Sequence, residues 1–148
     1  MNYNIIHLCS RSLVVAVMSV LAVQFAPASN APLVSGSYEV LQETRLGSQE
    51  QIRLRIRLVN HGLSDLFIQR MTLWDSSHPE RGGSQACAVT LHAHGSAETI
   101  QEFTIRQHEY ELWQKGLRPR FILEMPGPGT ARRTTVVRLD PIAGKEAK

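Results

Sequence analysis

The segment Gln51–Asn60 constrains the fold of this chain more than any other, because its side chains alternate in character. It reads QIRLRIRLVN, in which four apolar residues alternate with three arginines: Ile52, Leu54, Ile56 and Leu58 with Arg53, Arg55 and Arg57. A period of two with one apolar face and one charged face is typical of a half-buried β-strand. The rest of the chain is therefore expected to cover the apolar face of this strand.

Six further segments have the length and composition of strands: Tyr38–Leu46, Leu66–Trp74, Ala86–Ala93, Glu98–Arg106, Arg120–Met125 and Arg133–Leu139. Turn residues separate them, as in Asn60-His61-Gly62 and in the Pro-Gly-Pro-Gly run 126–129. Between the fifth and sixth of the seven expected strands, the segment Gln107–Lys115 breaks the alternation. Its Tyr110 and Trp113 lie three positions apart and Gly116 follows, which predicts a short helix with a glycine stop.

This order of elements predicts the fold class. Seven short strands at near-regular spacing with one short helical crossover indicate an all-β protein, a seven-stranded antiparallel β-sandwich. We expect the sandwich to span residues 37–140, after a lead-in at residues 29–36 and before a flexible tail at residues 141–148.

The N-terminal segment predicts export. Residues 1–12 carry one positive charge, Arg11, and no acidic residue; Leu13–Phe25 is almost wholly apolar, and the small-residue run APASNA follows. This is the layout of a secretory signal peptide. The Ala26-Pro27-Ala28 triplet fits the cleavage pattern, so we expect removal of residues 1–28. An uncleaved membrane anchor is the alternative, but a spanning helix needs ~20 apolar residues, more than this run supplies.

Charge and cysteine content set further limits on the mature chain. The full sequence has 16 basic and 13 acidic residues, and losing Arg11 leaves 15 and 13, a net charge of +2. A charge of this size does not by itself predict a nucleic-acid partner. Cys87 would be the one cysteine left, so an internal disulfide is excluded and a buried structural cysteine is expected. An intermolecular disulfide through Cys87 is the alternative.

Two runs of sequence suggest a family. The run LVNHGLSDLFIQRMTLWD resembles the strand-turn-strand of bacterial immunoglobulin-like sandwiches, and the residues that carry the match are Val59, Asn60, Gly62, Leu66 and Ile68. The later run LHAHGSAETIQEFTI is similar to the hairpin before their penultimate strands. These sandwiches include the cell-adhesion-related domains of bacteria and the fibronectin type III-like modules. The resemblance covers roughly Ser37–Leu139. It implies a sandwich that binds or acts as a spacer, no catalytic residues, and a bacterial source with a periplasmic or cell-surface destination.

The arginines Arg53, Arg55 and Arg57, here called the arginine ladder, are the strongest candidate for a binding face. Three guanidinium groups on one strand face could hold phosphate, sulfate or carboxylate groups of an anionic glycan or an acidic protein. The alternative is an ordinary solvated face. In an immunoglobulin-like sandwich the second and fifth strands are neighbours, so Glu98 and Glu102 could pair with the ladder.

Aromatic and histidine side chains give two further candidates. Tyr110 and Trp113 could form a platform for a glycan or a protein partner, or they could close one end of the core. His92 and His94, two apart on an expected strand, would face the same side and could hold a divalent metal with a third ligand. The alternative is two surface histidines. A Cys87 nucleophile is disfavoured, because apolar neighbours raise the pKa of a thiol.

The sequence contains no Gly-rich phosphate loop, no G-x-S-x-G and no H-E-x-x-H motif. We therefore expect an exported, non-enzymatic module without a cofactor that binds a protein or an anionic envelope component and no nucleic acid. It would meet a membrane only through an uncleaved signal segment. The alternatives are a periplasmic metal-binding protein that uses His92 and His94, and a small enzyme whose site the sequence does not reveal.

Overall fold

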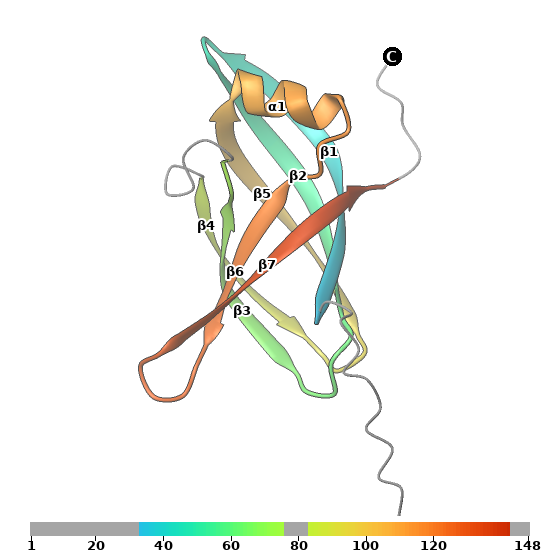
Figure 1. Cartoon of the computed structure of the whole chain (residues 1–148), viewed down its shortest axis with the longest axis vertical. Helices are drawn as coiled ribbons and strands as arrows, with labels where there is room; N and C mark the ends of the chain where they lie inside the picture. Colours follow the sequence, from blue (N-terminus) through green and yellow to red (C-terminus); the bar gives the residue numbers. More distant parts are fainter. Residues whose placement is uncertain (1–32, 76–82, 143–148) are drawn as a thin grey trace, which may run out of the picture. The chain divides into compact units, whose positions relative to one another are not determined.

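The computed structural model describes residues 33–75 and 83–142. The expected signal peptide and the last six residues of the expected tail lie outside the described residues. The described part forms seven strands and one helix (Figure 1): β1 Val34–Leu46, β2 Gln49–Asn60, β3 Leu66–Leu73, β4 Ser84–Leu91, β5 Ser96–Arg106, α1 Gln107–Gln114, β6 Arg120–Pro126 and β7 Arg132–Pro141. The all-β prediction is confirmed. The first strand begins at Val34 rather than Tyr38, so the expected lead-in is already part of the sheet.

The strands form one sheet in the order β4-β3-β6-β7-β1-β2-β5. It is mixed rather than wholly antiparallel, because β1 and β7 run parallel from Gly36 opposite Leu139 to Tyr38 opposite Pro141. Every other described pair is antiparallel. Strand β7 pairs first with β6 and then with β1, and so joins two groups of strands (Figure 1). The strands at the two ends of the order, β4 and β5, lie in contact with each other.

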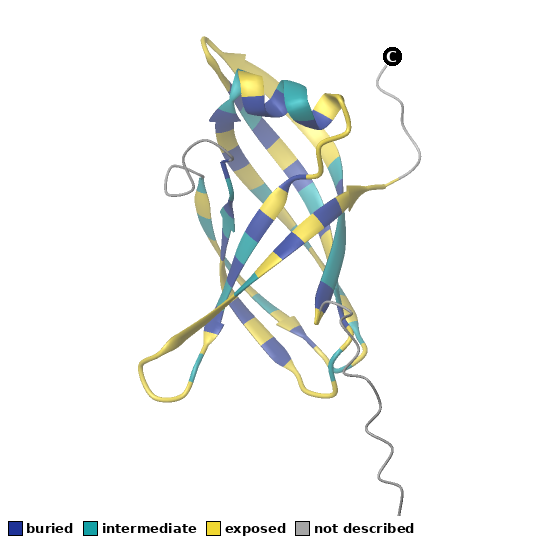
Figure 2. Ribbon diagram, in the orientation of Figure 1, coloured by how far each residue is buried: buried dark blue, intermediate teal, exposed yellow. Residues whose placement is uncertain are grey.

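The alternation in β2 places its apolar side chains in the core. Ile52, Leu54, Ile56 and Leu58 are fully buried, and the arginines between them lie on the outer face. The same banding runs along several other strands (Figure 2). Each such burial contributes about 1.5–3 kcal/mol, so the four side chains of the β2 row together contribute about 6–12 kcal/mol.

Helix α1 is the expected short helix, and its end follows from Gly116. The N–H of Gly116 donates to the carbonyl of Trp113 at 2.9 Å, and the N–H of Leu117 donates to that of Leu112 at 2.9 Å. This pair of bonds is the Schellman motif, which needs a residue with positive φ, and Gly116 has φ 95°. Within the described residues no helix is long and apolar enough to cross a membrane.

Asn60 fixes the turn after β2. Its side chain is fully buried, and its Nδ2 donates to the carbonyls of Ser64, Leu91 and His92 at 2.9, 3.2 and 3.1 Å. Its Oδ1 accepts from the N–H of Gly62 at 2.9 Å. One amide therefore holds the end of β2 to the end of β4, which explains structurally why the turn carries an asparagine.

Candidate functional site

The arginine ladder lies on the outer face of β2, between β1 and β5. Arg55 pairs with Glu39 of β1, which lies directly opposite it, with 2.6 Å between Nη1 and Oε2. Arg53 lies opposite Glu102 of β5, and Arg57 lies opposite Glu98. The expected neighbours are therefore present. The closest ion pair, however, is made by the carboxylate of Glu39 on β1, which was not among the expected partners.

The other two arginines of the ladder make no ion pair within the part of the chain that the structure describes. Glu102 accepts a hydrogen bond from Gln51, and Arg57 reaches the hydroxyl of Ser96 at 3.5 Å. Even so, the three guanidinium groups share one face with three carboxylates, those of Glu39, Glu98 and Glu102. This face carries no net positive charge, so its long-range attraction for an anion is weak.

A second outer face carries excess positive charge. It is formed by outward residues of β3, β6 and β7, and we call it the β3–β6–β7 face. Together with the ion pair of Arg118 and Asp140 at its edge, this face has five arginines and two acidic residues. They are Arg70, Arg118, Arg120, Arg132, Arg138, Glu124 and Asp140. No single segment of the sequence points to this face, because its arginines are spread over three strands and a loop.

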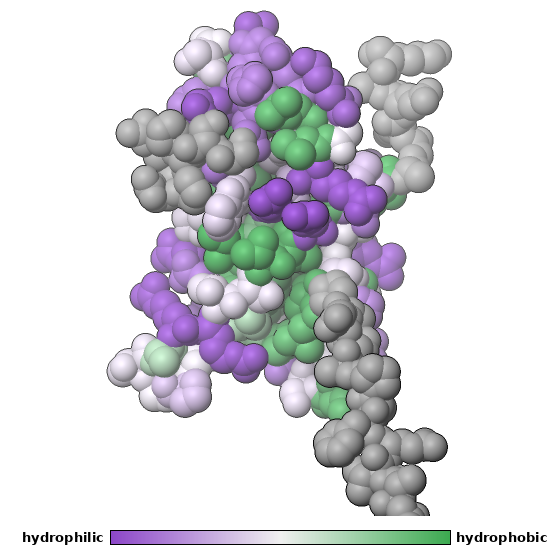
Figure 3. All heavy atoms as spheres, viewed as in Figure 1, coloured by the Kyte–Doolittle hydropathy of each residue, from purple (hydrophilic) through white to green (hydrophobic). Residues whose placement is uncertain are grey.

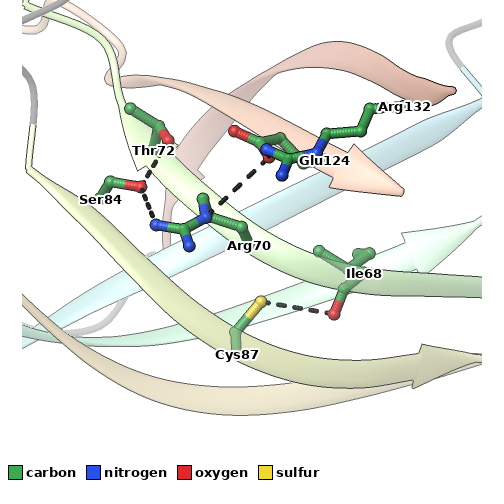
Figure 4. Close-up of polar contacts among 7 residues, drawn as sticks. All are labelled: Ile68, Arg70, Thr72, Ser84, Cys87, Glu124 and Arg132. Carbon is green, nitrogen blue, oxygen red and sulfur yellow. Dashed lines mark hydrogen bonds and ion pairs between the residues drawn. The ribbon is translucent and has the colours of Figure 1, made fainter. Parts of the chain in front are cut away.

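The two carboxylates of the β3–β6–β7 face are already engaged. Glu124 lies between two guanidinium groups, 3.3 Å from Arg132 and 4.0 Å from Arg70 (Figure 4). Asp140 pairs with Arg118 at 2.9 Å. In contrast, Arg120 and Arg138 lie directly opposite each other, and neither has a hydrogen-bond or ion-pair partner among the described side chains. Like charges directly opposite each other on neighbouring strands are destabilising.

Apolar side chains lie next to these arginines. Ile122 and Val136 are directly opposite each other in the row beside Arg120 and Arg138, and Val136 is 52% exposed. Phe67, which is 42% exposed, lies at the other end of β3, opposite Thr90 of β4. Figure 3 shows the side on which β6 and β7 lie in front: hydrophobic atoms gather at its centre with hydrophilic groups above and below. Exposed apolar area beside unpaired charge is typical of a protein-binding surface.

Tyr110 and Trp113 are both buried, on the side of α1 that faces the sheet. The Trp113 ring makes edge contacts with the rings of Tyr38 and Tyr110, at 6.0 Å between centroids in both cases. Tyr110 donates its hydroxyl hydrogen bond to Glu43, and burial together with this carboxylate raises the pKa of its phenol. The two rings form the expected cap of the core, and neither offers an open face for stacking.

The strand geometry expected for His92 and His94 is not present, because β4 ends at Leu91 rather than Ala93. His94 has φ 54° and lies in a turn closed by the N–H of Gly95, which donates to the carbonyl of His92 at 2.9 Å. Asp65 holds this turn: it accepts from the N–H of Ala93 at 2.8 Å and contacts His92 Nδ1 at 3.0 Å. These two contacts lower the pKa of Asp65. No described group of three histidine, cysteine or acidic residues is arranged to hold a metal ion.

Cys87 lies on β4 with its side chain half-buried against the core. Its Sγ donates to the carbonyl of Ile68 at 3.6 Å (Figure 4), and burial raises the pKa of the thiol. A raised pKa reduces the thiolate fraction at neutral pH. This environment fits the expected structural cysteine better than a nucleophile.

Comparison with known proteins leaves this chain without a family assignment. No model of a protein family matches it, and no curated protein matches its sequence. Its structure is similar to a crystal structure of a protein from Archaeoglobus fulgidus, with 11% identity and a TM-score of 0.39. The similar region covers 71% of this chain and 89% of that chain.

Proposed function

We propose that this chain is an exported, non-enzymatic binding module with an immunoglobulin-like β-sandwich. It binds an acidic protein surface through the β3–β6–β7 face. The strand order supports the sandwich, because β2 pairs with β5 and β3 pairs with β6, as the resemblance to such sandwiches requires. The N-terminal signal-like segment supports export.

One observation carries the binding proposal: Arg120 and Arg138 lie directly opposite each other with no described carboxylate partner. A like-charged cross-strand pair costs about 0.2–1 kcal/mol of stability, and an anionic partner would remove this repulsion. The two carboxylates of this face, those of Glu124 and Asp140, already form ion pairs with other arginines.

The partner is proposed to be a protein because the apolar pair Ile122 and Val136 lies directly beside the cationic pair Arg120 and Arg138. A polysaccharide that carries phosphate or sulfate groups would pair with the arginines and leave Ile122 and Val136 exposed to water. An acidic protein segment with an aliphatic side chain would cover both kinds of group. The arginine ladder remains a second anion-binding face of the same module, weaker because it is balanced by glutamates.

The test compares two matched double substitutions. Arg120→Gln/Arg138→Gln removes the unpaired arginines, and Arg53→Gln/Arg57→Gln removes two arginines of the ladder. The probe is a fluorescent acidic peptide that contains leucine, followed by anisotropy at low and at physiological salt. We expect the first variant to lose at least about tenfold in affinity, or 1.4 kcal/mol, and the second to change it by less than about twofold.

The stability of the two variants separates binding from folding. Arg120→Gln/Arg138→Gln should melt slightly above the wild type, because it removes a repulsive pair. Equal affinity in the wild type and this variant would overturn the proposal. Binding of a sulfated polysaccharide in place of the peptide would overturn the assignment of a protein partner.

A further inference from the structure

An open groove of about 370 Å³ lies between α1 and the ends of β1 and β2. Its walls are polar and carry mostly negative charge: three glutamates, Glu43, Glu50 and Glu111, and one arginine, Arg45. This groove uses none of the residues of the β3–β6–β7 face and carries charge of the opposite sign. It is large enough for a small ligand group.

Most of the polar side chains in the groove are held by one another. Arg45 Nη2 donates to Gln107 Oε1 at 2.6 Å, and Gln107 Nε2 donates in turn to Glu111 Oε1 at 2.9 Å. Glu43 accepts the hydroxyl hydrogen bond of Tyr110. These bonds orient two of the three carboxylates and occupy the one guanidinium group of the groove.

Glu50 is the exception. It is only 9% exposed, and no hydrogen bond or ion pair holds its carboxylate within the described residues. Arg45 lies directly opposite it in the register of β1 and β2, but that guanidinium group is turned to Gln107. The Glu50 residue is largely covered, but its carboxylate oxygens still open into the groove, because Trp113 Nε1 is the only side-chain polar atom of the described residues that is fully buried without a partner. A largely covered carboxylate loses part of its hydration, and such groups are usually found paired. A carboxylate that opens into a groove and has no partner in the protein points to a ligand that supplies the missing positive charge.

We propose that this groove binds an organic cation, a primary ammonium or guanidinium group, with Glu50 as its main ion-pair partner. A guanidinium or ammonium group needs only one or two carboxylates and some hydrogen-bond acceptors. A metal ion would need a closer set of ligands, and the described residues provide no such set. The cation could belong to a free amine or to a lysine or arginine side chain of a protein.

The experiment is an NMR titration of the full chain with n-butylammonium and with methylguanidinium, using n-butanol as the uncharged control. We expect saturable shifts at the amides of Glu50, Tyr110 and Gln114, with a dissociation constant on the order of 1 mM for either cation. Glu50→Gln should weaken binding at least about fivefold. Glu98→Gln, which removes an exposed carboxylate on the outer face of β5, should leave it unchanged.

Thermal stability adds a readout that a structural carboxylate would not give. If the unpaired carboxylate of Glu50 lowers the stability of the free protein and binds the cation, Glu50→Gln should raise the melting temperature of the free protein and weaken cation binding. Should this variant fail to fold, Glu111→Gln tests the same groove from α1. Shifts of equal size with n-butanol, or affinity unchanged by either substitution, would overturn the proposal.

A peptide that carries one lysine or arginine distinguishes the two sources of the cation. Tighter binding of the peptide than of n-butylammonium assigns the groove to a protein side chain, and equal binding assigns it to a free amine. The acidic peptide used for the β3–β6–β7 face should not shift the amides of this groove. The two proposals therefore fail independently.

Discussion

Replacing Trp113 by alanine tests whether α1 closes the core. The indole is 5% exposed and touches two other aromatic rings. An aromatic side chain buries about 150–250 Å². At about 25 cal/mol per Å² this is worth about 4–6 kcal/mol. The unsatisfied indole N–H reduces the stability lost on substitution, because Nε1 of Trp113 is buried without a hydrogen-bond partner in the described structure. Such a group costs about 1–3 kcal/mol. We expect Trp113→Ala to lower the free energy of unfolding by about 3–5 kcal/mol.

Trp113→Phe is the matched variant. It keeps a ring in contact with Tyr38 and Tyr110 and removes the unsatisfied N–H. The smaller ring lowers the free energy of unfolding, and removal of the buried N–H raises it, so the two effects partly cancel. We expect a change of less than about 1.5 kcal/mol. Urea unfolding followed by circular dichroism gives both numbers, and the half-buried Trp74 remains as a fluorescent reporter. A loss below about 1 kcal/mol in Trp113→Ala would refute the cap. Equal losses in the two variants would refute the reasoning about the N–H.

Two smaller predictions concern β4. Ala88 has φ 39° at a bulge opposite β3, so Ala88→Gly should stabilise the protein by about 0.5–1 kcal/mol in chemical denaturation, whereas Ala86→Gly in regular strand should destabilise it. Burial places the pKa of the Cys87 thiol in the folded protein above the value of about 8.5 in the unfolded chain. The contribution of the buried, protonated thiol to stability is therefore complete below about pH 8.5 and is lost as the pH rises through the folded pKa. Unfolding free energies measured above about pH 8.5 should fall less steeply in Cys87→Ala, and an unchanged slope would contradict burial of the thiol.

Local sequence pattern predicted the elements of this fold well, because each pattern has a local physical cause. The alternation from Gln51 to Asn60 is a property of one strand, and the glycine stop at Gly116 is a property of one helix end. The end of β4 was predicted less well. Its turn is held by Asp65, which lies 28 positions before the amide of Ala93, and a contact so distant in sequence leaves no periodic signal.

The net charge of a sheet face could not be predicted from any one strand. Arg53, Arg55 and Arg57 attract notice because they are close in sequence, yet Glu39 and the two glutamates of β5 balance them across the strands. Arg120 and Arg138 are each unremarkable in their own segments and become a pair only through the register of β6 and β7. The charge on a face is a sum over neighbouring strands, so the strand order has to be known before the face can be found. The same holds for Glu50, which looks like an ordinary acidic residue until α1 covers the end of β2.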